Sequence, residues 1–402
     1  MLSALVLAAC HPSSGLAGKG DKSRSRATSS TVGSGGVGAN KGHPAPSLPV
    51  CNQMSQIASW SVDRRVAQLI VVPVDESNVS QAAPLVAQGA GGVFLFGSYA
   101  PPGIGAQIAA LAATAPAGVA PIVMADEEGG GIQSLSNVVG SLPWPRMMAE
   151  TYTPAQVQAQ ATQVARNMSR IGVTMDLAPV LGIDSGPGPD AQHPIGARSF
   201  GGTPAMVSTY ALAFARGLMA GGVVPVVKHF PGLGRASYNT DFGPAYTPPL
   251  SSLETFDLIP FENAIAAKVP AVMVSNASIP GLTRGPASLS KAAIQGLLRQ
   301  KLGFKGLVLT DSLSAQAISD IGLGVGPAAV KAVEAGVQMI LFTAPAGESS
   351  NQASQQVLND LASAVNAGQI SQAQLDSAVA AVLQVKNVNL CNLHGGGAAA
   401  GG

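Results

Sequence analysis

Short apolar runs recur along the chain at fairly regular intervals. They are rich in Val, Ile, Leu, Met and Phe, and Gly, Pro or polar residues bound them. They are apolar throughout rather than alternating, as is typical of strands buried on both faces. The runs span residues 68–74, 92–97, 121–126, 172–180, 223–230, 271–278, 306–312 and 336–343. The pattern therefore predicts eight strands in a mainly parallel sheet.

Helical patterns separate most of these runs. Thr153 and Pro154 begin one of them, because Thr is a good N-cap and Pro suits the first helical position. Further helices are predicted at residues 203–220, 251–267, 290–302, 326–335, 352–368 and 371–387. Eight strands that alternate with helices favour a single α/β domain, a (β/α)8 TIM barrel. A doubly wound open sheet is the alternative, but no Gly-rich phosphate loop follows the first run.

Composition narrows the class of partner. The chain has 402 residues, of which 47% are hydrophobic, so it can bury a large core. Only 11% of the residues are charged and the net charge is +1, with no basic stripe of the kind that nucleic acid requires. We therefore expect no nucleic-acid partner. We also expect the protein to be a monomer.

The first ten residues differ from the rest of the chain. The apolar run at residues 4–9 is far too short to span a membrane, and it ends in Leu-Ala-Ala-Cys. This resembles a bacterial lipoprotein signal, in which Cys10 would carry the lipid; an ordinary signal peptide with a coincidental cysteine is the alternative. Residues 11–50, rich in Ser, Gly and Lys, then fit a flexible tether. The expected protein is exported and anchored by lipid to the outer face of the cytoplasmic membrane or the cell envelope.

Two further cysteines, Cys51 and Cys391, bracket the globular part. An exported chain meets an oxidising compartment, where a disulfide between them would persist. Two unpaired buried thiols remain the alternative, because free Cys is common in protein cores. The domain is therefore expected to span residues 51–391, followed by a disordered tail at 392–402.

Polar side chains follow several of the predicted strands. The carboxyl ends of the strands are where TIM barrels carry their chemistry, so we expect these side chains to share one site. A single Asp could instead be the N-cap of the next helix, but residues from five runs are harder to explain in that way. Carboxylates, cations and an amide suit a ligand rich in hydroxyl groups, and the spacing of His and Cys indicates neither a metal site nor a cofactor. The residues are Asp126, Asp176, Arg198, Lys228, His229, Asn276 and Asp311.

Five motifs, in order, resemble those of the single-domain β-N-acetylglucosaminidases of glycoside hydrolase family 3. The similarity covers roughly residues 55–345. The motifs are DEEGG (126–130), IGARSFG (195–201), KHFPG (228–232), PASLS (286–290) and GFKGLVLTDSLS (303–314).

The resemblance implies a retaining exo-glycosidase that removes a terminal β-linked sugar, expected to be N-acetylglucosamine, in cell-wall or glycan turnover. In such enzymes a carboxylate attacks the anomeric carbon and water then releases the sugar from a covalent intermediate. By position, Asp311 is the expected nucleophile. The other matched positions imply that these residues bind the sugar: Asp126, Arg198, Lys228, His229 and, in place of a family histidine, Asn276.

The chain departs from the family at the acid/base loop. The family has Lys-His-Phe-Pro-Gly-His-Gly, four variable residues and Asp-Ser-His, in which the last His is the acid/base and the Asp orients it. Here His229 keeps the first histidine of this motif, Leu233 replaces the second, and Asn239-Thr240-Asp241 replaces Asp-Ser-His. One interpretation is that Asp241 has become the acid/base and Asn239 orients it. The alternatives are a weak or inactive sugar-binding lipoprotein, or activity on another sugar; Asn and Asp are also common turn residues.

Overall fold

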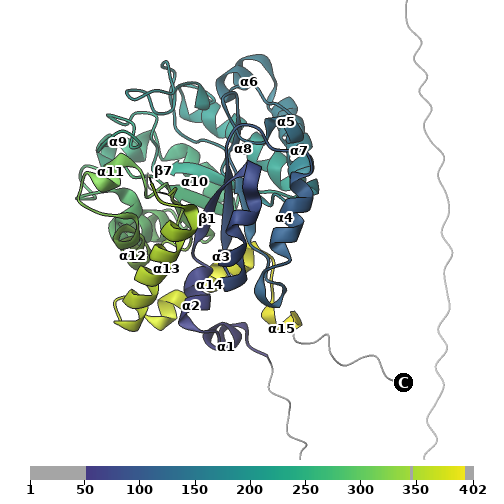
Figure 1. Cartoon of the computed structure of the whole chain (residues 1–402). Helices are drawn as coiled ribbons and strands as arrows, with labels where there is room; N and C mark the ends of the chain where they lie inside the picture. Colours follow the sequence, from purple (N-terminus) through teal and green to yellow (C-terminus); the bar gives the residue numbers. More distant parts are fainter. Residues whose placement is uncertain (1–50, 345–346, 394–402) are drawn as a thin grey trace, which may run out of the picture. The chain divides into compact units, whose positions relative to one another are not determined.

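The computed structural model describes residues 51–344 and 347–393, and these form one α/β barrel (Figure 1). Seven strands pair in parallel, in the order β1-β2-β3-β6-β7-β8-β9. Two further short strands, β4 and β5, form an antiparallel hairpin. The strands are β1 Val71–Asp75, β2 Gly92–Phe96, β3 Ile122–Ala125, β4 Glu127–Gly129, β5 Ile132–Gln133, β6 Met175–Asp176, β7 Val224–Phe230, β8 Ala271–Val274 and β9 Leu307–Thr310.

The eighth apolar run closes the sheet through isolated bridges. Ile340 bridges to Ile70, beside β1, and Met339 bridges to Leu309 of β9. The backbone N–H of Val71 donates to the carbonyl of Ile340 at 3.1 Å, which connects the first and last parts of the sheet. The predicted TIM barrel is therefore confirmed, although residues 336–343 pair at single positions rather than as a continuous strand.

Helices surround this sheet, and most lie where the sequence predicts them. The predicted helix at 251–267 is wrong as a single element, because the structure breaks it into α9 and α10 around Phe256. Pro260 lies in the first turn of α10, where proline is tolerated, but it would disrupt the interior of one longer helix. The longer helices are α4 Ile104–Ala112, α7 Pro154–Arg170, α8 Pro204–Ala220, α10 Ile259–Ala266, the π-helix η5 Ala292–Lys301, α12 Val325–Ala335, α13 Ser350–Asn366 and α14 Gln372–Val385. The shorter ones are α1 Gln53–Ala58, α2 Val62–Ala67, η1 Glu76–Ala82, α3 Ala83–Gln88, η2 Pro116–Gly118, α5 Ser136–Val139, α6 Pro145–Thr151, η3 Gly196–Arg198, α9 Leu250–Thr255, η4 Ala287–Leu289, α11 Gln316–Ser319 and α15 Leu390–Leu393.

Two apolar layers hold the barrel together. The larger lies between the sheet and the helices, and the smaller fills the barrel interior, where Val71, Met124, Met175 and Leu309 are buried. Val382 of α14 belongs to the interior cluster, so α14 closes the barrel at the end where the strands begin. The other end, where the strands finish, is left for the polar residues.

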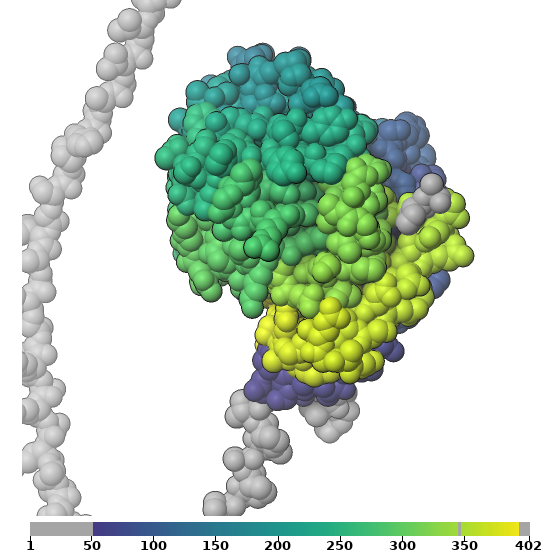
Figure 2. All heavy atoms as spheres, turned by 90° about the vertical axis from the view of Figure 1, so that its left-hand side faces the viewer, coloured from purple at the N-terminus to yellow at the C-terminus, as the bar shows by residue number. Residues whose placement is uncertain are grey.

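The closed end also joins the two ends of the described domain. Cys51, just before α1, and Cys391, in α15, form a disulfide with their Cα atoms 5.7 Å apart. Figure 2 shows the yellow C-terminal helices lying against the purple N-terminal segment at this end. Helix α15 continues to Leu393, two residues past the predicted end of the domain. The predicted signal (1–10, with Cys10), the tether (11–50) and residues 394–402 lie outside the described residues.

Between residues 51 and 393, leaving aside 345 and 346, no helix is both long and apolar enough to cross a membrane.

Candidate active site

A cavity of about 270 Å³ opens where the parallel strands end. Apolar side chains from the barrel interior line its inner part, and they include Phe94, Leu177, Met273 and Leu341. The polar lining comes from the end of β7, from β4 and from the loops after β3, β6, β7 and β9. These polar residues are Asp126, Glu128, Arg198, Lys228, His229, Asn239, Thr240, Asp241, Asp311 and Ser312.

A network of four alternating charges forms one wall of the cavity. Lys228 Nζ lies 2.5 Å from Asp126 Oδ1 and 2.6 Å from Glu128 Oε1. Arg198 donates two parallel hydrogen bonds to the carboxylate of the same Glu128, from Nε at 2.9 Å and from Nη2 at 2.8 Å. Such two-point pairing fixes the plane of the guanidinium group. The cations are therefore already oriented before any ligand arrives.

Glu128 is the residue of this wall that the sequence reasoning did not single out. Its carboxylate is buried between the two cations, whereas the predicted Asp126 reaches the cavity. Alternate residues of an extended segment face the same side, so Glu128, two positions after Asp126, could have been assigned to the same face. Its pairing with Arg198, 70 residues away, could not have been predicted from the sequence.

The charges in the wall stabilise one another. Burial alone would raise the pKa of Glu128, but Arg198 and Lys228 outweigh it and lower that pKa to about 2. Burial would likewise lower the pKa of Lys228, but Asp126 and Glu128 outweigh it and hold that pKa above its usual value. Glu128 and Lys228 therefore stay ionised throughout the physiological range.

His229 lies beside this wall as a neutral ring. Burial lowers its pKa well below the usual value, and the neighbouring Arg198 and Lys228 lower it further. Its Nδ1 is buried and has no hydrogen-bond partner among the described residues. Because His229 lines the cavity, a hydroxyl group that enters can approach this neutral ring.

Two carboxyl groups face the cavity from the opposite loops. Asp311 follows β9, and its Oδ1 accepts the backbone N–H of Ser312 at 2.8 Å. Burial and the charge of Asp241 raise the pKa of Asp311 to about 7, against the opposing effects of Ser312, Lys228 and Arg198. Asp241 reaches solvent at the rim, yet the surrounding loop desolvates it enough to raise its pKa as well. Each of the two carboxyl groups is therefore protonated more readily than a free aspartic acid.

The segment that carries Asp241 is a well-anchored turn. The backbone N–H of Asp241 donates to Asn239 Oδ1 at 3.0 Å, and that of Phe242 donates to the carbonyl of Asn239 at 3.1 Å. The carbonyl of Thr240 accepts from Ala317 of α11 at 3.0 Å. Asn239 therefore holds the backbone of the turn, which is the common turn role of this residue, and does not contact the carboxyl group of Asp241.

Asn276 does not line the cavity, although the sequence predicts that it binds the ligand. It is buried below the loop after β9, where its Nδ2 donates to the carbonyl of Ser312 at 2.7 Å. Its Oδ1 accepts the hydroxyl of Ser288 at 2.6 Å. The structure thus places Asn276 behind Asp311 and Ser312 rather than facing a ligand.

Two more acids lie behind the charged wall. Asp176 Oδ1 accepts the backbone N–H of Glu127 at 3.0 Å, and Glu127 in turn accepts from Leu135 and Gln133. Burial raises the pKa of Glu127 to about 8 and raises that of Asp176 well above its usual value. These two side chains hold the DEEGG segment from behind, outside the cavity.

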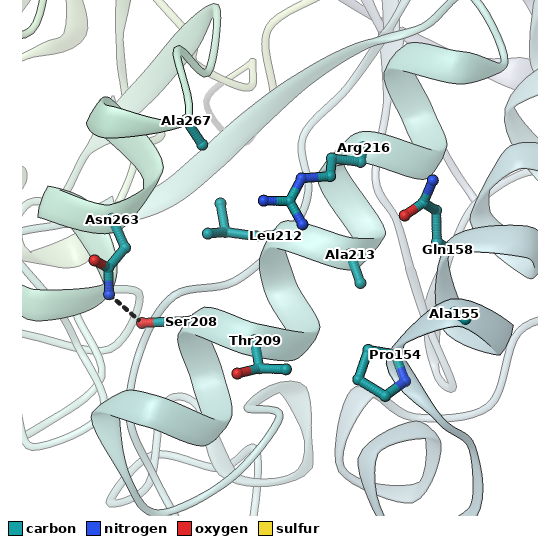
Figure 3. A pocket seen from close by; sticks show the side chains of 10 residues that line it. All are labelled: Pro154, Ala155, Gln158, Ser208, Thr209, Leu212, Ala213, Arg216, Asn263 and Ala267. Atoms are coloured by element: carbon teal, nitrogen blue, oxygen red, sulfur yellow. Dashed lines mark hydrogen bonds between the residues drawn. The ribbon is translucent and has the colours of Figure 1, made fainter.

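A larger hollow lies on the outside of the barrel, between α7, α8 and α10, with a volume of about 630 Å³ (Figure 3). Asn263 of α10 donates to Ser208 of α8 across it at 2.9 Å. Its described lining includes one cation, Arg216, and no carboxylate. The chemistry therefore lies at the smaller cavity, where acids and bases converge.

Comparison with known proteins agrees with this geometry. The family model "Glycosyl hydrolase family 3 N terminal domain" matches residues 61–385. Beta-hexosaminidase LpqI of Mycobacterium tuberculosis is 37% identical over 334 residues, which are 81% of this chain and 82% of that protein. The solved structure of M. tuberculosis LpqI superposes with a TM-score of 0.76 at 35% identity, covering 84% of this chain and 97% of that one. A beta-N-acetylhexosaminidase from Beutenbergia cavernae gives a TM-score of 0.74 at 30% identity, covering 82% and 100%.

Proposed function

Because this chain belongs to glycoside hydrolase family 3 and is a β-hexosaminidase-like glycoside hydrolase, we propose that it is a retaining exo-enzyme with Asp311 as nucleophile. Asp241 is the proposed acid/base. The observation that carries the proposal is that these two carboxyl groups line one small cavity. Retaining glycosidases use a pair of carboxyl groups that flank the bond to be cleaved.

The reaction proceeds in two displacements. An oxygen of ionised Asp311 attacks the anomeric carbon, the bond from that carbon to the glycosidic oxygen breaks, and Asp241 gives its proton to the departing oxygen. Asp241, now an anion, takes a proton from water, whose oxygen attacks the same carbon and releases Asp311. This step requires Asp311 as the anion and Asp241 as the acid. The N–H of Ser312 and the nearby Lys228 and Arg198 favour the anion on Asp311, and they act against burial and the charge of Asp241, which raise its pKa to about 7.

The charged wall is the proposed binding site for the terminal sugar. Asp126 can accept from hydroxyl groups, and Lys228 and Arg198 retain N–H groups beyond those used on the carboxylates. His229 contributes its neutral ring. We propose terminal β-linked N-acetylglucosamine as the substrate, since the two relatives described above are hexosaminidases by name.

The proposed setting is outside the cytoplasm, in cell-wall or glycan turnover. The Cys51–Cys391 disulfide supports export, because such bonds persist in oxidising compartments. The Leu-Ala-Ala-Cys sequence at residues 7–10 supports lipid anchoring through Cys10. In this proposal the membrane is met only through that lipid.

A sugar-binding lipoprotein with little activity is the second candidate. It is favoured by the loss of the family's Asp-His dyad, since Asn239 and Asp241 occupy those places. A protein that only binds sugar has no need of a carboxylate at position 311, however, and Asp311 is retained at the wall of the cavity.

Hydrolysis of two aryl glycosides tests the proposal: an aryl β-N-acetylglucosaminide and an aryl β-glucoside. Wild type should cleave the first, and Asp311→Ala should abolish the activity while circular dichroism shows an intact fold. Asp241→Ala should form the glycosyl-enzyme from the reactive aryl substrate but hydrolyse it slowly, and added azide should restore turnover. Failure of wild type on both substrates would favour the binding protein.

A further inference from the structure

The small volume of the cavity means that a substrate must extend beyond it. At about 270 Å³, with apolar side chains closing its inner end, the cavity suits one sugar ring. If the proposed function holds, the bond to be cleaved lies beside Asp241, which reaches solvent at the rim. The leaving group therefore rests on the residues that flank Asp241.

We infer that Asp190, His193 and Phe242 form a subsite for a leaving-group sugar at this rim. The inference rests on the proposed function and adds to it the substrate class: β-linked disaccharides and longer chains, bound through the ring that departs.

The position of the segment from Asp190 to Pro194 supports this inference. The carbonyl of Ala191 accepts the N–H of Asn239 at 2.9 Å, which places the segment against the turn of Asp241. At its other end the carbonyl of Pro194 accepts from Arg198 at 3.1 Å, and Pro194 lines the cavity. His193 thus lies on a segment held between the proposed acid and the sugar-binding wall.

His193 is held in a way that suits ligand binding. Its Nδ1 lies 3.2 Å from Asp190 Oδ1 and 3.3 Å from Oδ2, so the ring orientation is restrained. The side chain is 45% exposed, and Nε2 forms no hydrogen bond to any residue that the structure describes. An oriented ring nitrogen at the rim can exchange a hydrogen bond with a sugar hydroxyl at little entropic cost.

Phe242 adds an exposed apolar surface next to Asp241 in the sequence. It follows Asp241 directly, and 58% of its surface is exposed, which is high for so large an apolar residue. Its backbone N–H bonds to Asn239, so the ring is attached to the anchored turn. Aromatic rings bind well where one face is apolar and the edge is wet, as on a pyranose ring.

Kinetics on two donors separate this subsite from the catalytic machinery. The substrates are the β-linked disaccharide of N-acetylglucosamine and the corresponding glycosyl fluoride, whose leaving group is too small to reach the rim residues. His193→Ala and Phe242→Ala should each lower kcat/KM for the disaccharide about tenfold more than for the fluoride. Equal losses on both substrates, or none on the disaccharide, would overturn the inference. Loss of the fluoride reaction in wild type would instead count against the proposed function.

A control and a binding measurement complete the test. Met219→Ala is the matched control, because Met219 is 40% exposed near the end of α8, beside the start of β7, and thus lies at the opposite end of the strands from the cavity. It should change neither reaction. In an Asp311→Asn background, calorimetry should show the disaccharide binding about tenfold more tightly than N-acetylglucosamine, and His193→Ala should remove that difference. Equal affinities in the protein with an intact rim would refute the subsite without any need for turnover.

Discussion

At the scale of single residues, the site depends on cations that are oriented by buried carboxylates. Glu128 accepts two bonds from Arg198 and one contact from Lys228, and Asp126 holds Lys228 from the other side. A lysine at position 198 would keep the charge but not the two-point geometry, because its ammonium is a point donor on a flexible stem.

Arg198→Lys should therefore lower kcat/KM on an aryl N-acetylglucosaminide by about 100-fold, which corresponds to about 2.7 kcal/mol of lost stabilisation. Steady-state kinetics measure the loss. The control is Arg235→Lys, which alters an arginine paired with Asp257 away from the cavity. Comparable activity losses in the two variants would mean that the effect is on general stability rather than on the site.

The buried pair Glu127 and Asp176 gives the stability of the fold a particular pH dependence. The pKa of each of these acids is raised in the folded state. At a pH between its unfolded and its folded pKa, each acid therefore binds more protons in the folded protein than in the unfolded chain. For Glu127 this window runs from 4.5 to about 8. The free energy of unfolding should therefore fall as the pH rises through this window, by on the order of a few kcal/mol.

Asp176→Asn tests this pH dependence. The amide oxygen can still accept the N–H of Glu127, while the buried charge is removed. Chemical denaturation at pH 5 and pH 8.5 should show a smaller loss of stability than in wild type, and the variant should be more stable at pH 8.5 by about 1–3 kcal/mol. If the free energy of unfolding changes with pH to the same extent in the variant and in wild type, Asp176 is not the source of the effect.

At the scale of elements, the ends of β8 and β9 are joined by one amide. Asn276 bonds to the carbonyl of Ser312 and to the hydroxyl of Ser288, so it links the loops after both strands. This explains how Ser312, whose N–H holds Asp311, is itself held in place.

Asn276→Ala should lower the free energy of unfolding by about 1–3 kcal/mol, since it leaves buried polar groups without partners. It should lower kcat more than it raises KM, because Asn276 does not touch the cavity. Ser288→Ala, which removes one of the two bonds, should produce a smaller loss of both stability and kcat. A rise in KM alone would mean that Asn276 binds the sugar, as the sequence predicts.

Much of the fold follows from the sequence because each predicted strand is a local apolar run. Seven runs contain or overlap a strand, and the eighth pairs with its neighbours through isolated bridges at Met339 and Ile340. Its incomplete pairing depends on both neighbouring strands, which no local pattern records. The break between α9 and α10 could have been read from Pro260, since proline does not fit the interior of a helix.

The site was partly predictable for the same reason. Asp126, Lys228 and Asp311 follow predicted strands directly, and the structure places all three at one cavity. The strand pattern could not predict contacts between distant loops. Examples are the ion pair of Arg198 with Glu128 and the hydrogen bond from the N–H of Asn239 to the carbonyl of Ala191. Asn276 lies outside the cavity lining, because the end of a strand can face either the ligand or the loop next to it.

At the scale of the whole molecule, the disulfide joins the first and last described helices under the closed end of the barrel. The two cysteines are 340 positions apart in the sequence, so the bond restricts nearly the whole unfolded chain. Helix α14 packs between this bond and the barrel interior, because it contacts α1 and places Val382 in the interior cluster.

The double variant Cys51→Ser, Cys391→Ser should be less stable by about 2–4 kcal/mol, and its thermal unfolding midpoint should fall. Activity at 25 °C should be unchanged, because the active site lies at the opposite end of the barrel. A reducing agent should lower the midpoint of wild type to that of the variant and leave the variant itself unaffected. Equal midpoints before reduction would show that the bond adds no stability.

The closed end of the barrel also leaves one approach to the cavity free. Cys51 lies under α14, and the cavity opens at the opposite end of the strands. A group that binds the described domain beside Cys51 therefore leaves the cavity opening uncovered, and a ligand can still enter while the closed end is occupied.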